Sequence, residues 1–150
     1  MVAAILLICS AHAWADLVWR QPGPADGMDV WYGSFYNKTG MYDEKLRVGG
    51  WGDEYDTLIR FDLSGLPQVA DQAVIWLWGY PQSGSPTHTW IHWWLITSPW
   101  QSASVGWDTR PNSFSLGYTP PPSTSGGWYG VNFTNQYNVW RSGITSPLNY

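Results

Sequence analysis

Apolar and polar residues alternate along several short stretches of the chain, and this alternation predicts β-strands. Glycine, proline and other turn-forming residues separate the stretches. Apolar residues at helical spacing continue for no more than about two turns anywhere in the chain. One short helix or helical turn is expected at residues 134–143, capped by Thr134. The strands are expected at residues 16–21, 27–37, 45–51, 57–66, 73–80, 89–96 and 128–134. The pattern therefore predicts an all-β fold, organised as a sandwich or barrel.

Two of these stretches, residues 73–80 and 89–96, are rich in tryptophan, and alternation divides each of them into two faces. One set of side chains is expected to point inward: Ala73, Ile75, Leu77, Ile91 and Trp93. The other set would share one outward face if the two stretches pair as neighbours: Trp76, Trp78, Trp90, His92 and Trp94. Such a flat aromatic face suits the C–H patches of sugar rings, so it predicts a glycan platform. Two alternatives stay open. Another segment of the chain could cover this aromatic face, or the face could be an interface through which protein molecules assemble.

Composition supports a folded domain with a neutral ligand. The 150 residues include 13 Trp, 9 Tyr and 4 Phe, while only 12% are charged, which argues against disorder. The length suits a single domain. The net charge is −4 and no cluster of lysine and arginine occurs, so nucleic acid and anionic membranes are not expected partners. A polysaccharide or cell-surface glycan fits this balance better.

The first 15 residues are expected to be a secretion signal. An apolar stretch from Val2 to Cys9 is followed by small-residue cleavage sites that end at Ala13 or Ala15. The stretch is too short to span a bilayer as a helix. Residues 16–150 would then form one secreted or cell-surface domain without any cysteine, because Cys9 is the chain's single cysteine.

Five carboxylates lie in two loops on either side of residues 45–50, and they allow two interpretations. They are Asp43, Glu44, Asp53, Glu54 and Asp56. The simpler interpretation is a pair of exposed acidic turns. The alternative is a structural calcium site, because calcium binds several carboxylate and carbonyl oxygens.

Catalytic patterns are missing from the sequence. The chain has no HExxH, GxSxG or phosphate-loop motif. His88 and His92, four residues apart in a strand, would lie about 13 Å apart, which is too far to share one metal ion. Acids within one loop do not oppose each other across a substrate as the pair in a glycosidase does. The sequence therefore does not predict an enzyme.

The order of several segments resembles the DNRLRE domain family. The segments are residues 46–67, which include Leu58-Ile59-Arg60-Phe61-Asp62-Leu63-Ser64, then residues 73–80, 98–111 and 139–150. The resemblance covers residues 29–150 and implies a secreted, jelly-roll type antiparallel β-sandwich. Modules of this family occur in cell-surface proteins and beside polysaccharide-degrading enzymes. Trp100 and Trp107 match positions that the resemblance assigns to the core.

The family pattern continues past this point into a final strand, whereas the given sequence stops at Tyr150. The expectation is therefore a fragment, or a sandwich whose last strand comes from elsewhere. An unpaired groove of this kind favours strand addition by a partner chain. The function predicted from the sequence is non-catalytic polysaccharide binding. The alternative is a structural cell-surface or filament subunit that assembles through aromatic faces or strand addition.

Overall fold

The computed structural model of the chain describes residues 5–9, 17–21, 27–35, 38–40, 43–49, 54–81 and 90–142. This part of the chain is mostly β-structure with one short α-helix, so the strand-rich class expected from the sequence is confirmed. The strands are β1 (Ile5–Cys9), β2 (Val18–Arg20), β3 (Gly27–Gly33), β4 (Lys38–Thr39), β5 (Tyr55–Phe61), β6 (Gln72–Gly79), β7 (Ile91–Ile96), β8 (Ser113–Thr119) and β9 (Gly127–Asn132). The helix is α1 (Thr134–Ser142), and a 3-10 turn, η2, spans Trp107–Thr109. Within these ranges, no helix has the length and apolar character needed to cross a membrane.

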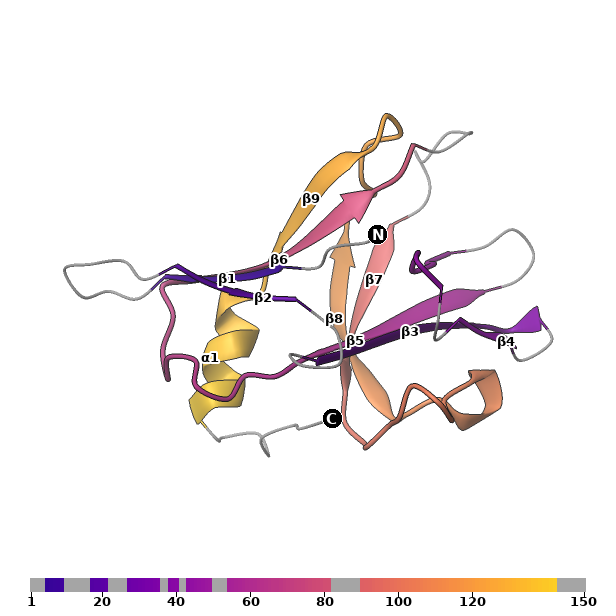
Figure 1. Ribbon diagram of the computed structural model, residues 1–150, viewed down its shortest axis with the longest axis horizontal. Helices are drawn as coiled ribbons and strands as arrows, with labels where there is room; N and C mark the ends of the chain where they lie inside the picture. Colours follow the sequence, from indigo (N-terminus) through magenta and orange to yellow (C-terminus); the bar gives the residue numbers. More distant parts are fainter. Residues whose placement is uncertain are drawn as a thin grey trace.

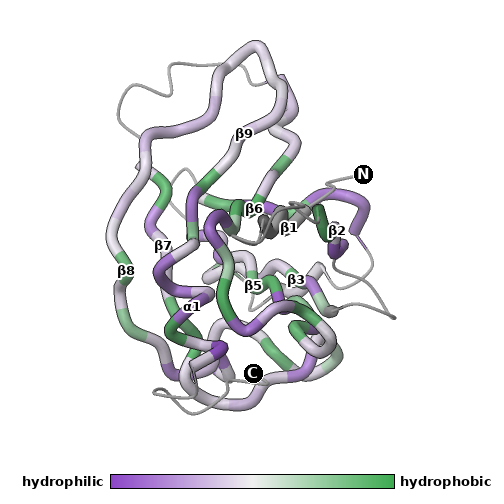
Figure 2. The backbone as a smooth tube through the Cα atoms, turned by 90° about the vertical axis from the view of Figure 1, so that its left-hand side faces the viewer, coloured by the Kyte–Doolittle hydropathy of each residue, from purple (hydrophilic) through white to green (hydrophobic). Residues whose placement is uncertain are grey.

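The strands form three antiparallel sheets (Figure 1). The first has the order β2-β1-β6-β9, the second β4-β3-β5, and the third is the β7-β8 hairpin. In Figures 1 and 2 the β3–β5 sheet lies below the β1–β6–β9 sheet, and the hairpin runs along one side, past both levels. Among the residues that the structure describes, the hydrogen bonds define three separate sheets, and they do not define a closed sandwich.

The first core cluster lies on one face of β6. Ala73 is fully buried there, and Ile75 packs against the same cluster, as the alternation within this strand predicts. The fully buried Tyr137 of α1 joins them, and its hydroxyl donates a hydrogen bond to the carbonyl of Pro67. Asn138 binds both the amide and the carbonyl of Ala70, at 2.8 and 3.0 Å. These bonds join α1 to residues 67–70, the segment that leads into β6.

The start of α1 differs from the expectation in its capping residue. The Oδ1 atom of Asn132 accepts a hydrogen bond from the Thr134 amide, the first amide of the helix, at 2.9 Å. The Thr134 hydroxyl instead accepts the amide of Ala73 at 2.9 Å. The backbone amide of Phe133 also donates to the Ala73 carbonyl, at 2.8 Å. The helix start is therefore joined to β6, a contact between segments that lie far apart in the sequence.

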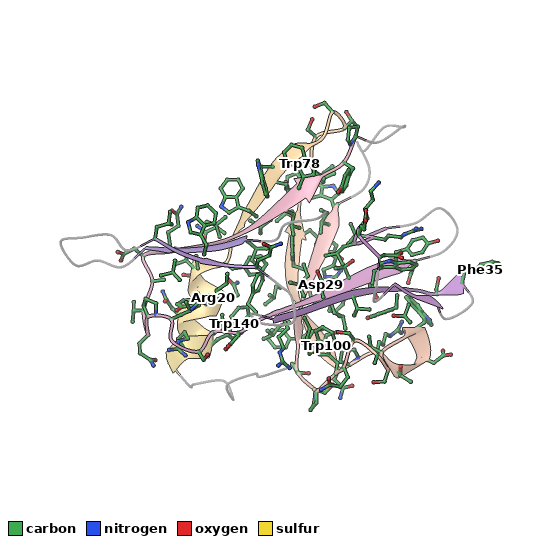
Figure 3. All side chains as sticks on the ribbon, viewed as in Figure 1. Arg20, Asp29, Phe35, Trp78, Trp100 and Trp140 are labelled. Atoms are coloured by element: carbon green, nitrogen blue, oxygen red, sulfur yellow. The ribbon has the colours of Figure 1, made fainter. Side chains whose placement is uncertain are left out.

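A second core cluster lies on the β3–β5 sheet. Val30 and Leu58 are paired across the two strands and pack with Tyr32, Trp100 and Val105. Trp107, in η2, is partly buried against this cluster. Trp100 is buried below β3 and β5 in the view of Figure 3. The prediction that Trp100 belongs to the core is therefore confirmed, whereas Trp107 packs against the core and stays partly exposed.

The strand expected at residues 45–51 does not form in its described part. Residues 45–49 are not in a strand, and within them only Gly49 makes an isolated bridge, to Tyr55. Their cationic side chains cover aromatic rings instead: Arg47 lies 4.6 Å from the ring centre of Trp31, and Lys45 lies 4.4 Å from that of Tyr80.

The sequence pattern also missed β8. Its sequence does alternate, since Phe114, Leu116 and Tyr118 are separated by polar or small residues. In the structure, β8 has a register shift opposite Trp93 and Trp94 and a positive φ (106°) at Gly117.

The structure places part of the expected signal sequence in a sheet. Ile5–Cys9 forms β1, between β2 and β6, and pairs with both strands in antiparallel register. Removal of residues 1–15 would therefore take away the strand between β2 and β6.

Replacing Leu58 with alanine is expected to lower the free energy of unfolding by about 2–5 kcal/mol, because it leaves a cavity among buried neighbours. Urea unfolding followed by tryptophan fluorescence measures this change. Val69→Ala is the control, since Val69 is exposed and the change should stay within about 0.5 kcal/mol. Equal losses in the two variants would contradict the assignment of Leu58 to the core.

Candidate functional site

The two tryptophan-rich strands do not pair with each other. β6 lies between β1 and β9, whereas β7 pairs with β8 in a separate sheet. The expected single face of Trp76, Trp78, Trp90, His92 and Trp94 is therefore divided between two surfaces, and the prediction that these strands are neighbours is wrong. Strand alternation gave the faces correctly, but the choice of partner strand depends on contacts distant in sequence.

The first surface is the outer face of β6 and β9. We call it the tryptophan strip and define it as Trp76, Trp78 and Trp128. Trp78 and Trp128 are register partners whose ring centres lie 5.4 Å apart at 79°, an edge-to-face pair. Their side chains are 39% and 51% exposed. Figure 3 shows Trp78 on the upper, outer side of the two strands.

Trp76 continues the strip along β6. Its register partner is Gly130, and a Cβ atom at that position would lie only 2.8 Å from Cζ3 of the Trp76 ring. The indole therefore lies against the backbone of β9, and glycine provides the space for it. Trp19 of β2 is half exposed and lies across β1 from β6, in the register row next to that of Trp76.

The second surface is on the β7-β8 hairpin. The imidazole of His92 lies between two rings, those of Trp94 and Tyr118, with a centre-to-centre distance of 4.0 Å to each. Its Nε2 atom lies 2.7 Å from the Ser115 hydroxyl. We call His92, Trp94 and Tyr118 the hairpin stack. Trp94 and Tyr118 are exposed, as is Trp90 just before β7.

The opposite side of β7 faces the interior, as expected. Trp93 makes an edge-to-face contact with the buried Phe133, at 5.1 Å between ring centres. Its Nε1 atom donates to the Thr119 hydroxyl at 2.7 Å. Ile75, Leu77, Ile91 and Trp93 all line an open cavity of about 1340 Å³ between the sheets.

A polar group of residues lines the same cavity. Asp56 of β5 and Tyr32 of β3 are register partners, and their side chains lie close enough to influence each other's pKa. Arg110, just after η2, stacks over Trp107 at 4.3 Å, and Trp107 in turn contacts Tyr32 edge-to-face. With His92 of β7 these residues form the Asp56 cluster, which we define as Tyr32, Asp56, His92 and Arg110.

Burial dominates the electrostatics of this cluster. It raises the pKa of the Asp56 carboxyl above its usual range, and the negative charge of Glu54 adds to the rise. The Tyr32 side chain and the positive charges of Arg110 and His92 oppose it. Burial, followed by the charge of Asp56, also raises the pKa of Tyr32, so this hydroxyl stays protonated and acts as a donor.

The acidic residues considered for calcium do not gather in the described structure. Among the residues placed, no three of histidine, cysteine, aspartate and glutamate lie close enough to hold a metal ion. Asp43 accepts a hydrogen bond from Trp31 Nε1 at 2.8 Å, Glu44 and Glu54 are exposed, and Asp56 faces the cavity. Asp53 and His88 lie outside the described residues.

Several residues of these surfaces were missed by the sequence reasoning. Trp128 and Tyr118 join them only through cross-strand pairing, and Tyr32 meets Asp56 in the same way. Alternation within residues 128–134 places Trp128 on one face of a strand, but it does not show which strand lies beside it.

Asp56→Asn is expected to raise the melting temperature at about pH 7. The pKa of Asp56 is higher in the folded state than its unfolded value of about 3.9. The protonated side chain therefore adds stability at a pH below the unfolded pKa, and this stability is lost as the pH rises through the folded-state pKa. Asparagine removes the unfavourable charge and keeps an oxygen for Tyr32. Scanning calorimetry should show that the gain disappears near about pH 3, where both side chains are neutral.

The matched control for this experiment is Asp71→Asn, because Asp71 is exposed. Surface changes of this kind usually leave stability within about 0.5 kcal/mol. A lower melting temperature of Asp56→Asn at pH 7 would show that the charged carboxylate stabilises the fold.

Comparison of the chain with protein-family models, with curated proteins and with solved structures finds no match. The resemblance to the DNRLRE family therefore stays a prediction.

Proposed function

We propose that the chain is a secreted, non-catalytic polysaccharide-binding module of the jelly-roll type. The tryptophan strip is its platform. The observation that carries the proposal is the exposure of Trp78 and Trp128 beside each other on two paired strands, with Trp76 in the next register row. Soluble proteins rarely leave a contiguous aromatic patch uncovered without a partner for it.

The strip has the properties that a sugar chain requires. Indole faces offer large apolar area against the C–H patches of pyranose rings, and each Nε1–H can donate to a hydroxyl. Paired strands hold the rings rigidly, so binding costs little side-chain entropy. The overall charge of −4 and the lack of cationic clusters favour a neutral glycan over a phosphate-bearing partner.

Trp76→Ala and Trp128→Ala are each expected to weaken binding to a polysaccharide about five- to tenfold. The physical reason is the loss of about 1–1.4 kcal/mol of aromatic contact. Affinity electrophoresis in gels containing cellulose derivatives, xylan or mannan measures retention, and circular dichroism checks the fold. Phe114→Ala is the matched control, because Phe114 is about as exposed as Trp128 and belongs neither to the strip nor to the cavity lining. Trp94→Ala tests the hairpin stack in the same assay.

Three results would contradict the platform. They are no retention by any of the polysaccharides, retention unchanged in both strip variants, and a loss seen only with Trp94→Ala. The last result would move the binding surface to the hairpin.

A second candidate function is structural, and the position of β1 favours it. β1 lies within the expected signal sequence and separates β2 from β6. If residues 1–15 are removed, both of these strands lose a pairing partner, and the gap between them is one strand wide. An extended segment of another chain could enter it by β-augmentation, which would build a cell-surface or filament assembly.

Cleavage of the folded chain after Ala15, at an introduced protease site, is expected to produce concentration-dependent oligomers. The reason is that exposed amide and carbonyl groups of β6 would recruit a strand from a neighbouring molecule. Sedimentation velocity compares the cleaved and the uncleaved chain. An excess of a peptide with the sequence of residues 2–11 should restore the monomer. A cleaved chain that stays monomeric at every concentration contradicts the assembly role.

A further inference from the structure

The cavity beside the β7-β8 hairpin is lined by polar and aromatic residues that mostly lie outside the tryptophan strip. Its volume of about 1340 Å³ exceeds the roughly 300–1,000 Å³ of common small-ligand sites. Residues of β5, β7 and the segment around η2 line it together, and neither Trp76 nor Trp128 does. The cavity and the strip are thus formed by different residues, apart from Trp78, which reaches the cavity lining.

The Asp56 cluster supplies complementary hydrogen-bonding groups to this cavity. A carboxylate offers about four acceptor sites for hydrogen bonds, and Asp56 lies opposite Tyr32 in the register of β3 and β5. Arg110 carries five N–H donors, and within the described ranges its guanidinium stacks on Trp107 without making a hydrogen bond. Asp56 and Arg110 influence each other electrostatically, but no ion pair between them is recorded among the placed residues. Both residues line the same cavity, and the charge of Arg110 acts on the Asp56 carboxyl.

Aromatic rings stand beside these polar groups. The hairpin stack contributes His92 and Trp94 to the cavity lining, and Trp90 and Trp107 line it as well. The stacking on both sides of the imidazole and its contact with Ser115 fix the orientation of His92. Apolar walls with a few convergent polar groups are the usual composition of a small-molecule site.

We propose that this cavity is a second ligand site, which takes one pyranose ring of a neutral sugar. The ring packs its C–H face against the aromatic wall. Two neighbouring hydroxyls lie between the Asp56 carboxylate, which accepts hydrogen bonds, and the Arg110 guanidinium, which donates them. Charge-assisted hydrogen bonds of this kind are about twice as strong as neutral ones and give the site its selectivity for hydroxyl-bearing ligands.

The geometry favours binding over hydrolysis at this site. Glu54 and Asp56 lie two residues apart at the start of one strand, so they approach a ligand from the same side. A glycosidase needs two carboxyl groups on opposite sides of the bond that it cleaves.

Saturation-transfer NMR with glucose, galactose, mannose and xylose, each added to the full chain, tests the site. At least one sugar is expected to give a signal, and Asp56→Asn or Arg110→Lys should weaken its Kd at least tenfold. Lysine keeps the charge of Arg110 but loses the planar fork of donors. Asp62→Asn is the matched control, since Asp62 also lines the cavity but lies six residues, roughly 20 Å, further along the chain from Asp56.

Trp128→Ala separates this proposal from that of the strip. Monosaccharide binding should survive in Trp128→Ala, while polysaccharide retention falls. Binding of a hexasaccharide shows whether the cavity takes free monosaccharides or the ends of sugar chains. A site for chain ends should bind the hexasaccharide at least as tightly as the monosaccharide. The proposal is overturned if none of the four sugars gives a signal, if Asp56→Asn binds like the unmodified chain, or if Asp62→Asn loses as much affinity as Asp56→Asn.

Discussion

The pairing of β6 with β9 is the contact on which most of the described structure depends. It aligns Trp78 with Trp128 and Trp76 with Gly130, and thereby forms the outer aromatic surface. At the end of β9 the chain turns back onto β6, where Thr134 and Phe133 bind the amide and carbonyl of Ala73. The same turn starts α1, which covers the inner face of β6. One strand pair thus positions both a core cluster and a candidate binding surface.

The second constraint is the register between β3 and β5. It sets Val30 opposite Leu58 in the core and Tyr32 opposite Asp56 at the edge of that core. An acidic side chain so placed is partly desolvated, and its raised pKa shows that the charged form is unfavourable there. Proteins commonly accept such a cost at sites that bind ligands, because a ligand can restore the lost hydrogen bonds.

The tryptophan side chains of the protein lie in three different environments. Trp100 is buried, Trp107 is half-buried beneath a guanidinium, and Trp78 and Trp128 of the tryptophan strip are exposed. The same residue type fills all three, because indole combines a large apolar area with one polar atom. Composition alone therefore predicts that aromatic packing and aromatic exposure both occur, without assigning a tryptophan to either.

The sequence by itself determined what depends on neighbouring residues. Alternation gave the strand character of residues 73–79 and 91–96, and it separated Ile75 from Trp76 and Trp93 from Trp94, because successive side chains of a strand point to opposite faces. The tertiary structure decided which strands lie side by side. It gave β6 the partner β9 instead of β7, brought Asp56 beside Tyr32, and divided one expected aromatic face into two. Strand pairing depends on packing between distant segments, and that information is absent from any short stretch of sequence.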